Sequence, residues 1–132
     1  MPCAYEIDAD YRLIRTRIWG LLTYAELTAN RLRMENDPAF KADFSQLADL
    51  REVTAIALTG DQIREFAAHS PFTPGTRGAV VASSDVAFGL GRVYGSYREA
   101  ISPKDQIRIF RHLNDAEEWL GLPIPRAHSA KR

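Results

Sequence analysis

The segment 47–66 constrains the fold more than any other part of the chain, because it reads as a strand, an apolar connection and then a helix. Leu47 and Leu50 belong to a short apolar run that is typical of a buried strand. Thr59 begins the helix, since Gln62 stands three residues later and completes a capping-box pattern. Such a segment directs backbone N–H groups toward the carboxyl end of a strand, where open α/β folds usually carry their sites.

Strands and helices alternate along the rest of the chain. Period-2 alternation of apolar and polar residues predicts an amino-terminal hairpin, and a continuous apolar run further on predicts a strand buried on both faces. The segment 53–58 is β-branched and apolar, and is compatible with a strand or with the approach to a helix. The expected order is ββαβαβαβα, with strands over 4–8, 11–19, 47–50, 78–82 and 106–110, and helices capped near Thr23, Thr59, Ser84 and Asn114.

This element order predicts the fold class. Strands that alternate with helices imply parallel connections, and the hairpin adds an antiparallel pair. We therefore expect a single α/β domain with a mixed, mostly parallel sheet. A chain of 132 residues fits one domain and buries enough surface for its own core. The domain is expected over 1–123, followed by a flexible basic tail over 124–132.

Charge and composition narrow the class of function. Seventeen basic and seventeen acidic residues cancel, which provides no electrostatic argument for a nucleic-acid partner. The single cysteine, Cys3, and the lack of a signal-peptide pattern favour a cytoplasmic location. No apolar run approaches the ~20 residues of an integral membrane segment. The three histidines have no metal-ligand spacing, so we predict neither a metal nor a cofactor.

The helix expected after Ser84 carries two periodic patterns. Three glycines, at positions 89, 91 and 95, are spaced one residue too widely for a dinucleotide-binding fingerprint and favour close packing against the sheet or another chain. Large apolar residues recur every three or four positions. They predict the face that this helix buries: Val86, Leu90, Val93, Tyr97 and Ile101.

Four segments of the chain, 45–54, 77–83, 88–92 and 116–121, resemble the STAS superfamily, whose fold is called SpoIIAA-like. More closely, they are similar to an uncharacterised bacterial group described as STAS/SEC14-like. The resemblance spans nearly the whole globular part. It implies a SpoIIAA-like fold and a non-enzymatic regulatory role like that of the anti-sigma-factor antagonists. The SEC14-like side of the name implies a lipid or small apolar ligand instead.

In the antagonist branch, a phosphorylated serine and a glycine begin the helix that follows the central strand. Thr59 matches that serine and Gly60 matches the glycine, whereas Ala57 and Leu58 replace the aspartate and serine before them. The resemblance therefore makes Thr59 and Gly60 a candidate phosphoacceptor or partner-binding site. The alternative is that Thr59 only caps its helix.

Two further groups of polar residues are candidates. Asp49 lies in an otherwise apolar strand, where a carboxylate either contacts a partner or pairs with a nearby arginine. Ser83 and Ser84 begin the next helix and, with Arg92, are a candidate anion or ligand site. Their alternative role is capping.

No residues form a complete catalytic motif. We therefore predict a non-enzymatic regulatory or protein-interaction domain, compatible with a homodimer, whose protein partner is unknown. The alternative is a carrier or sensor of a lipid or small apolar ligand, bound between the sheet and the helix that contains Tyr94 and Tyr97.

Overall fold

The computed structural model describes residues 3–123, which form one five-stranded sheet and four helices in the predicted order. The tail expected over 124–132 lies outside the described residues. The strands are β1 (Cys3–Asp8), β2 (Leu13–Thr23), β3 (Ser45–Ala57), β4 (Arg77–Val81) and β5 (Gln106–Phe110), and the helices are α1 (Tyr24–Glu35), α2 (Gly60–Ala68), α3 (Asp85–Ile101) and α4 (Leu113–Trp119).

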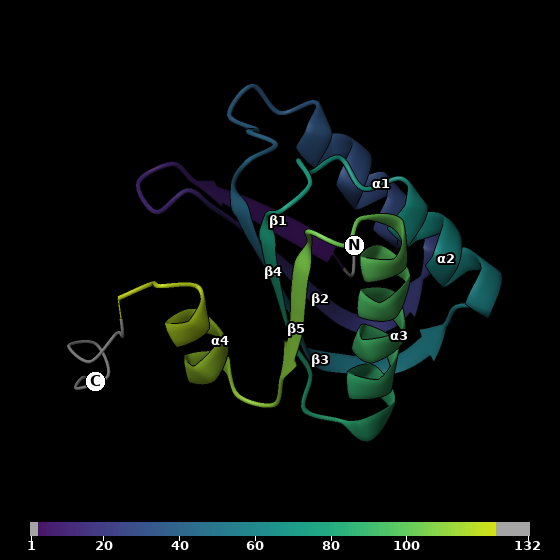
Figure 1. Cartoon of the computed structure of the whole chain (residues 1–132). Coiled ribbons are helices and arrows are strands. Elements are labelled where there is room, and N and C mark those ends of the chain that lie inside the picture. The colour runs from purple at the N-terminus through teal and green to yellow at the C-terminus, as the bar shows by residue number, and fades with distance from the viewer. Residues whose placement is uncertain (1–2, 124–132) are drawn as a thin grey trace.

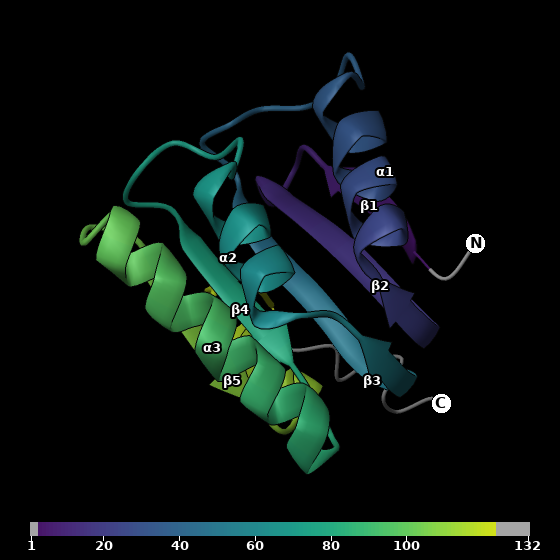
Figure 2. The same ribbon diagram turned by 90° about the vertical axis from the view of Figure 1, so that its right-hand side faces the viewer.

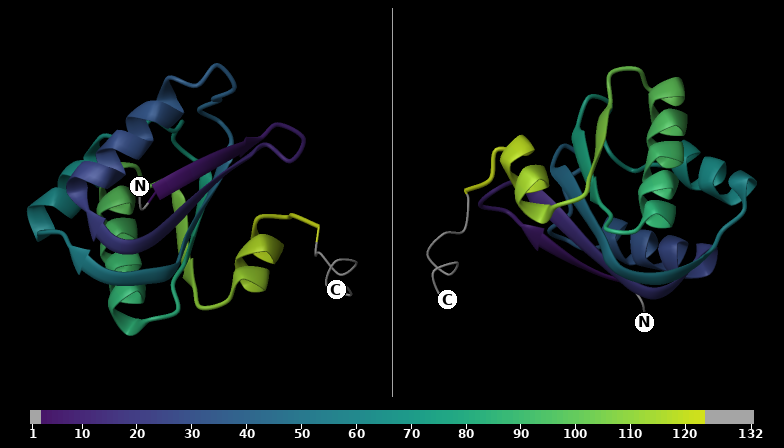
Figure 3. Two further views of the ribbon diagram at one scale, coloured as in Figure 1. Left: turned by 180° about the vertical axis from the view of Figure 1, so that it is seen from behind. Right: turned by 90° about the horizontal axis from the view of Figure 1, so that it is seen from below.

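The strands follow one another across the sheet in the order β1-β2-β3-β4-β5 (Figure 1). β1 is antiparallel to β2, and the other three pairs are parallel. Helices α1, α2 and α3 cover one face, which Figure 2 shows from the helix side. α4 covers part of the opposite face (Figure 3). The prediction of a single-domain α/β fold with a mixed, mostly parallel sheet is confirmed.

β3 is much longer than the predicted strand and includes the ambiguous segment. Its residues from Ala55 to Ala57 pair with the end of β2, beyond the part of β3 that pairs with β4. β-branched residues such as Val53 and Ile56 suit this extended pairing. Register shifts in β2, one of them beside Gly20 at a φ of 70°, accompany the curvature of the two long strands. The paired ends of β2 and β3 therefore extend past β4 as a two-stranded ribbon, and helix α2 begins just after this ribbon.

The predicted buried face of α3 is wrong. The side chains of Val86, Val93 and Ile101 are exposed, with relative accessibilities of 70%, 41% and 50%. The physical reason is the close approach of α3 to the sheet, where a Cβ at Gly91 would lie only 3.1 Å from Ile109 Cδ1. Small residues therefore occupy the inner face. The close-packing interpretation of the glycines is correct for Gly91 and Gly95 but wrong for Gly89, where a Cβ would meet nothing within 4 Å. The buried residues of α3 are Ala87, Gly91, Gly95 and Arg98.

Cys3 is a core residue. It is 3% exposed and packs in the same cluster as Ile18 and Leu22. Burial, with a smaller effect from the charge of Glu26, raises the pKa of the thiol to about 11. The sequence indicated no function for Cys3. In the structure, its side chain fills space in the core beside Ile18 and Leu22.

Candidate functional site

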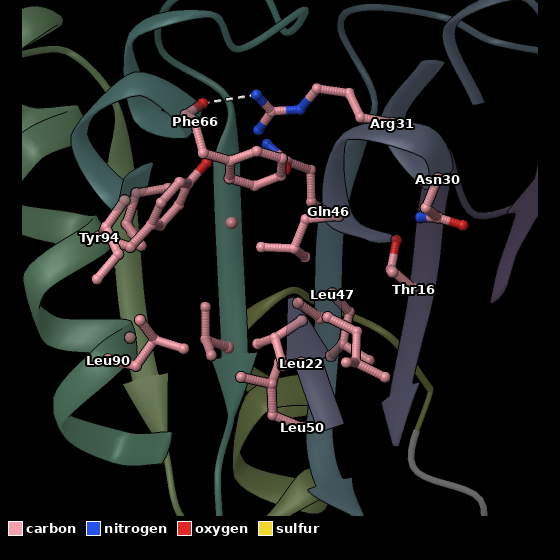
Figure 4. Close-up of a pocket in the computed structure, with 18 of the residues that line it drawn as sticks. Thr16, Leu22, Asn30, Arg31, Gln46, Leu47, Leu50, Phe66, Leu90 and Tyr94 are labelled. Atoms are coloured by element: carbon pink, nitrogen blue, oxygen red, sulfur yellow. Dashed lines mark hydrogen bonds between the residues drawn. The ribbon is translucent and has the colours of Figure 1, made fainter. Parts of the chain in front are cut away.

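A cavity of about 130 Å³ lies between the sheet and helices α1, α2 and α3 (Figure 4). We call it the helix-side cavity. The strands form its floor, which includes Ala48, and the helices form its walls. Its lining is mainly apolar and includes leucines and isoleucines of the strands, the helices and the segment between them, among them Leu22, Leu27, Leu50, Leu58, Ile63 and Leu90.

The helix-side cavity has a polar end and an apolar end. Leu22 and Leu50 lie at the apolar end, which is opposite to Arg31 in Figure 4. Asn30 is 5% exposed, so one of the polar lining residues is a core residue. The polar end is lined by Thr16, Asn30, Arg31, Gln46 and Tyr94.

Arg31 is the charged group at the polar end. Its Cζ lies 3.4 Å from the centroid of the Phe66 ring, in cation–π contact. Nη1 donates to the backbone carbonyls of Phe66, at 2.5 Å, and His69, at 3.2 Å. Burial lowers the pKa of the guanidinium, and the Tyr94 hydroxyl acts in the opposite direction. Arg31 therefore ties α1 to the carboxyl end of α2 and places a partly buried cation beside the cavity.

Sequence reasoning did not single out the polar end, although a signal was present. Leu27, Asn30, Arg31 and Met34 are spaced by three and four residues, which places them on one face of α1. Two polar residues on an otherwise apolar, inward face are more informative than an apolar residue at the surface. Leu32, an apolar residue on another side of the same helix, is 60% exposed.

Thr59 and Gly60 stand at the start of α2, as predicted. Thr59 Oγ1 accepts a hydrogen bond from the Gln62 N–H at 3.1 Å, and Gln62 Oε1 accepts one from the Thr59 N–H at 3.0 Å. Both bonds of the capping box are present, and Thr59 is exposed. The capping role is thus established, and phosphorylation of Thr59 stays a prediction.

Asp49 is paired within its own strand. Its Oδ1 accepts from the Arg51 backbone N–H at 3.1 Å and from Arg51 Nε at 2.9 Å, and its Oδ2 accepts from Arg51 Nη2 at 2.8 Å. Burial raises the pKa of Asp49, but these bonds outweigh burial and leave the pKa below its ordinary value. A carboxyl group with a lowered pKa is a weak general base near neutral pH. Asp49 also lines a second hollow of about 270 Å³, on the side of Arg15 and Arg17.

The structure separates the members of the predicted anion site. Ser84 Oγ accepts from the Ala87 N–H at 3.1 Å and caps α3. The arginine at this helix start is Arg111, whose Nη1 donates to the Ser83 carbonyl at 3.1 Å. Arg92 lies on the exposed side of α3, and none of the hydrogen bonds or ion pairs found within residues 3–123 joins it to either serine.

Metal binding and membrane crossing each require a particular arrangement of residues. Within residues 3–123, no three histidine, cysteine or acidic side chains are grouped closely enough to hold a metal ion. No helix in the same part of the chain has the length and apolar character needed to cross a membrane.

The element order, the sheet and the placement of the helices define an α/β domain with a SpoIIAA-like fold, as the sequence predicted. A similar solved structure is the crystal structure of an uncharacterised protein of the DUF3478 family with a SpoIIAA-like fold, from Shewanella loihica PV-4. The two chains are 18% identical, with a TM-score of 0.57, and the match covers 89% of this chain and 93% of the other. No protein-family model and no curated protein matches the chain. The likeness therefore concerns the fold.

Proposed function

We propose that this SpoIIAA-like domain is a non-enzymatic sensor or carrier of a small, mainly apolar molecule that binds in the helix-side cavity. The observation that carries the proposal is the cavity itself, a half-open space of about 130 Å³ between the sheet and the helices. An engineered apolar cavity of roughly 150 Å³ binds benzene. Sites for drug-sized ligands start at about 300 Å³. The cavity thus suits one ring or a short chain better than a long-chain lipid.

The energetics of packing favour an occupied cavity. Protein interiors are close-packed, with few voids larger than a water molecule. The helix-side cavity is open to solvent on one side, so its apolar lining is in contact with water. A ligand that covers this lining gains roughly 25 cal/mol for each Å² of apolar surface removed from water.

The proposal is tested with toluene as a neutral probe and with a variant that fills the cavity. Toluene is expected to raise the melting temperature of the wild-type protein, because it binds the folded state alone. Ala48→Leu places a larger side chain in the cavity floor and is expected to abolish the shift. Ala55→Leu, at an exposed position of the same strand, is the matched control and is expected to keep it.

Native mass spectrometry provides an independent measurement. Protein purified without detergent is sprayed under native and then denaturing conditions, and a molecule retained in the cavity is released only in the second case. A toluene shift that survives in Ala48→Leu, together with a clean apo mass, would contradict ligand binding in this cavity.

A second candidate function is regulation through a protein partner at Thr59. The observation that favours it is the exposed Thr59 hydroxyl at the first turn of α2. A phosphate there would gain the N–H groups and the dipole of the helix start. Thr59→Glu is expected to change the partners recovered from a lysate while the fold persists. Identical partners for the wild-type protein and the variant would count against this function.

We also propose that the domain acts in the cytoplasm and as a homodimer. The support for dimerisation is the outer side of α3, where Val86, Val93 and Ile101 are exposed. Light scattering on the wild-type protein and on Val93→Asp tests the proposal. A monomeric wild-type protein at micromolar concentration would contradict it.

A further inference from the structure

Arg31 is a partly buried cation, and within residues 3–123 no carboxylate forms an ion pair with it. The arginine–carboxylate ion pairs found within residues 3–123 engage Arg12, Arg15, Arg17, Arg51, Arg64, Arg98 and Arg111, but none engages Arg31. A desolvated charge is unfavourable unless it is paired and hydrogen-bonded. Arg31 is thus the charged group of the cavity lining, and its hydrogen-bond acceptors are neutral backbone carbonyls. The carboxylate of Glu35, on the same helix, acts on the pKa of Arg31 without an ion pair to it.

The contacts of Arg31 leave part of the guanidinium available. Both backbone carbonyls, of Phe66 and His69, accept from the same atom, Nη1. These two carbonyls belong to the end of α2, where the helix dipole favours a cation. Capping α2 therefore accounts for one edge of the group. A guanidinium has five N–H donors, and an edge that presents two of them in parallel matches a carboxylate.

The surroundings of the guanidinium suit the head of a small acid. The Tyr94 hydroxyl lies close enough to interact with Arg31, and Gln46 and Thr16 contribute neutral polar groups at the same end (Figure 4). Leucine side chains line the opposite end. The lining therefore changes from cationic and polar to apolar along the cavity.

We infer that the helix-side cavity takes a small organic carboxylate, with one ring or a short acyl chain, whose carboxylate pairs with Arg31 and whose hydrocarbon part lies among the leucines. This inference rests on the proposed function and names the class of ligand for the same site. A neutral hydrocarbon of the same size fills the apolar end but leaves the cation unpaired. The charge of Arg31 thus selects the carboxylate over its neutral analogue.

The test compares phenylacetate with toluene, which shares the ring but has no charge. Calorimetric titration at neutral pH is expected to show tighter binding of phenylacetate to the wild-type protein. Arg31→Met keeps an unbranched side chain of about the length of the arginine's aliphatic part but removes the charged guanidinium group. It is expected to weaken phenylacetate binding at least tenfold and to change toluene binding less than twofold.

One control and two further variants of the site complete the comparison. Arg64→Met removes one positive charge from the exposed side of α2 and is expected to leave both affinities unchanged. Tyr94→Phe removes only a hydroxyl and Arg31→Lys keeps the charge but not the parallel donors. If Arg31→Met does not fold, these two variants decide, and each is expected to weaken phenylacetate binding while toluene binding persists.

The outcomes separate the inference from the proposed function. Toluene binding that equals or exceeds phenylacetate binding, or phenylacetate binding that is insensitive to Arg31 and Tyr94, overturns the carboxylate inference and leaves the proposed function in place. Failure of both probes to bind overturns both.

Discussion

Arg98 of α3 and Asp105, just before β5, form an ion pair whose side chains are only 6% and 5% exposed. Each member of the pair also forms a hydrogen bond with a backbone group. Arg98 Nη1 donates to the Ala67 carbonyl at 2.6 Å, and Asp105 Oδ1 accepts from the Gly75 N–H at 2.8 Å. The pair therefore joins the end of α2, the loop before β4 and the end of α3, beside the polar end of the helix-side cavity.

Removal of one partner of this pair is expected to destabilise the domain strongly. Asp105→Ala leaves the Arg98 charge buried and unpaired, and such changes cost about 3–5 kcal/mol. Urea unfolding followed by circular dichroism measures the difference. Asp61→Ala, which removes a carboxylate that is 85% exposed and paired with Arg64, is the control and is expected to cost less than about 1 kcal/mol. Equal losses for the two variants would contradict a structural role for the buried pair.

The same pair predicts how stability depends on pH. Burial raises the pKa of Asp105, but the bonds from Gly75 and Arg98 outweigh burial and hold the pKa below its ordinary value of 3.8. The unfolded state therefore binds the proton more readily than the folded state. The contribution of Asp105 to the free energy of unfolding is present above pH 3.8 and is lost as the pH falls through the lower folded pKa.

Urea unfolding of the wild-type protein and of Asp105→Asn between pH 6 and pH 2.5 tests whether stability falls with pH in this direction. The wild-type protein is expected to lose stability toward the acid end of the range, and the variant is expected to lose less, because it lacks the titrating group. Parallel curves for the two proteins would show that Asp105 does not carry the acid sensitivity.

Cys3 is expected to react slowly with thiol reagents in the folded protein. Its pKa is raised to about 11, and the side chain is 3% exposed, so at pH 8 both the thiolate fraction and the access of the reagent are low. An unfolded cysteine has a pKa of about 8.5 and reacts readily. Absorbance after addition of Ellman's reagent, with and without urea, measures the contrast. Rapid labelling of the native protein would indicate that β1 opens at this end.

The sequence was sufficient to predict the element order and the start of α2, because these depend on local patterns. Thr59 and Gln62 cap each other wherever their helix packs, so their spacing alone was decisive. The helix-side cavity was harder to predict from the sequence. It depends on the distance between α3 and the sheet and on which face of α1 points inward, and both are set by tertiary packing. Arg31 acquires its role only because α1 lies beside the end of α2.

The closeness of α3 to the sheet predicts opposite effects at two neighbouring glycines. A Cβ at Gly89 meets nothing within 4 Å, so Gly89→Ala gains helix propensity and is expected to raise the free energy of unfolding by about 1 kcal/mol. A Cβ at Gly91 meets Ile109 Cδ1 at 3.1 Å and Val80 Cγ1 at 3.2 Å. Gly91→Ala gains the same backbone contribution but overpacks the core, which costs about 1–3 kcal/mol. Chemical denaturation is thus expected to place Gly91→Ala at least ~1 kcal/mol below Gly89→Ala, and equal stabilities would show that the sheet yields to the added methyl group.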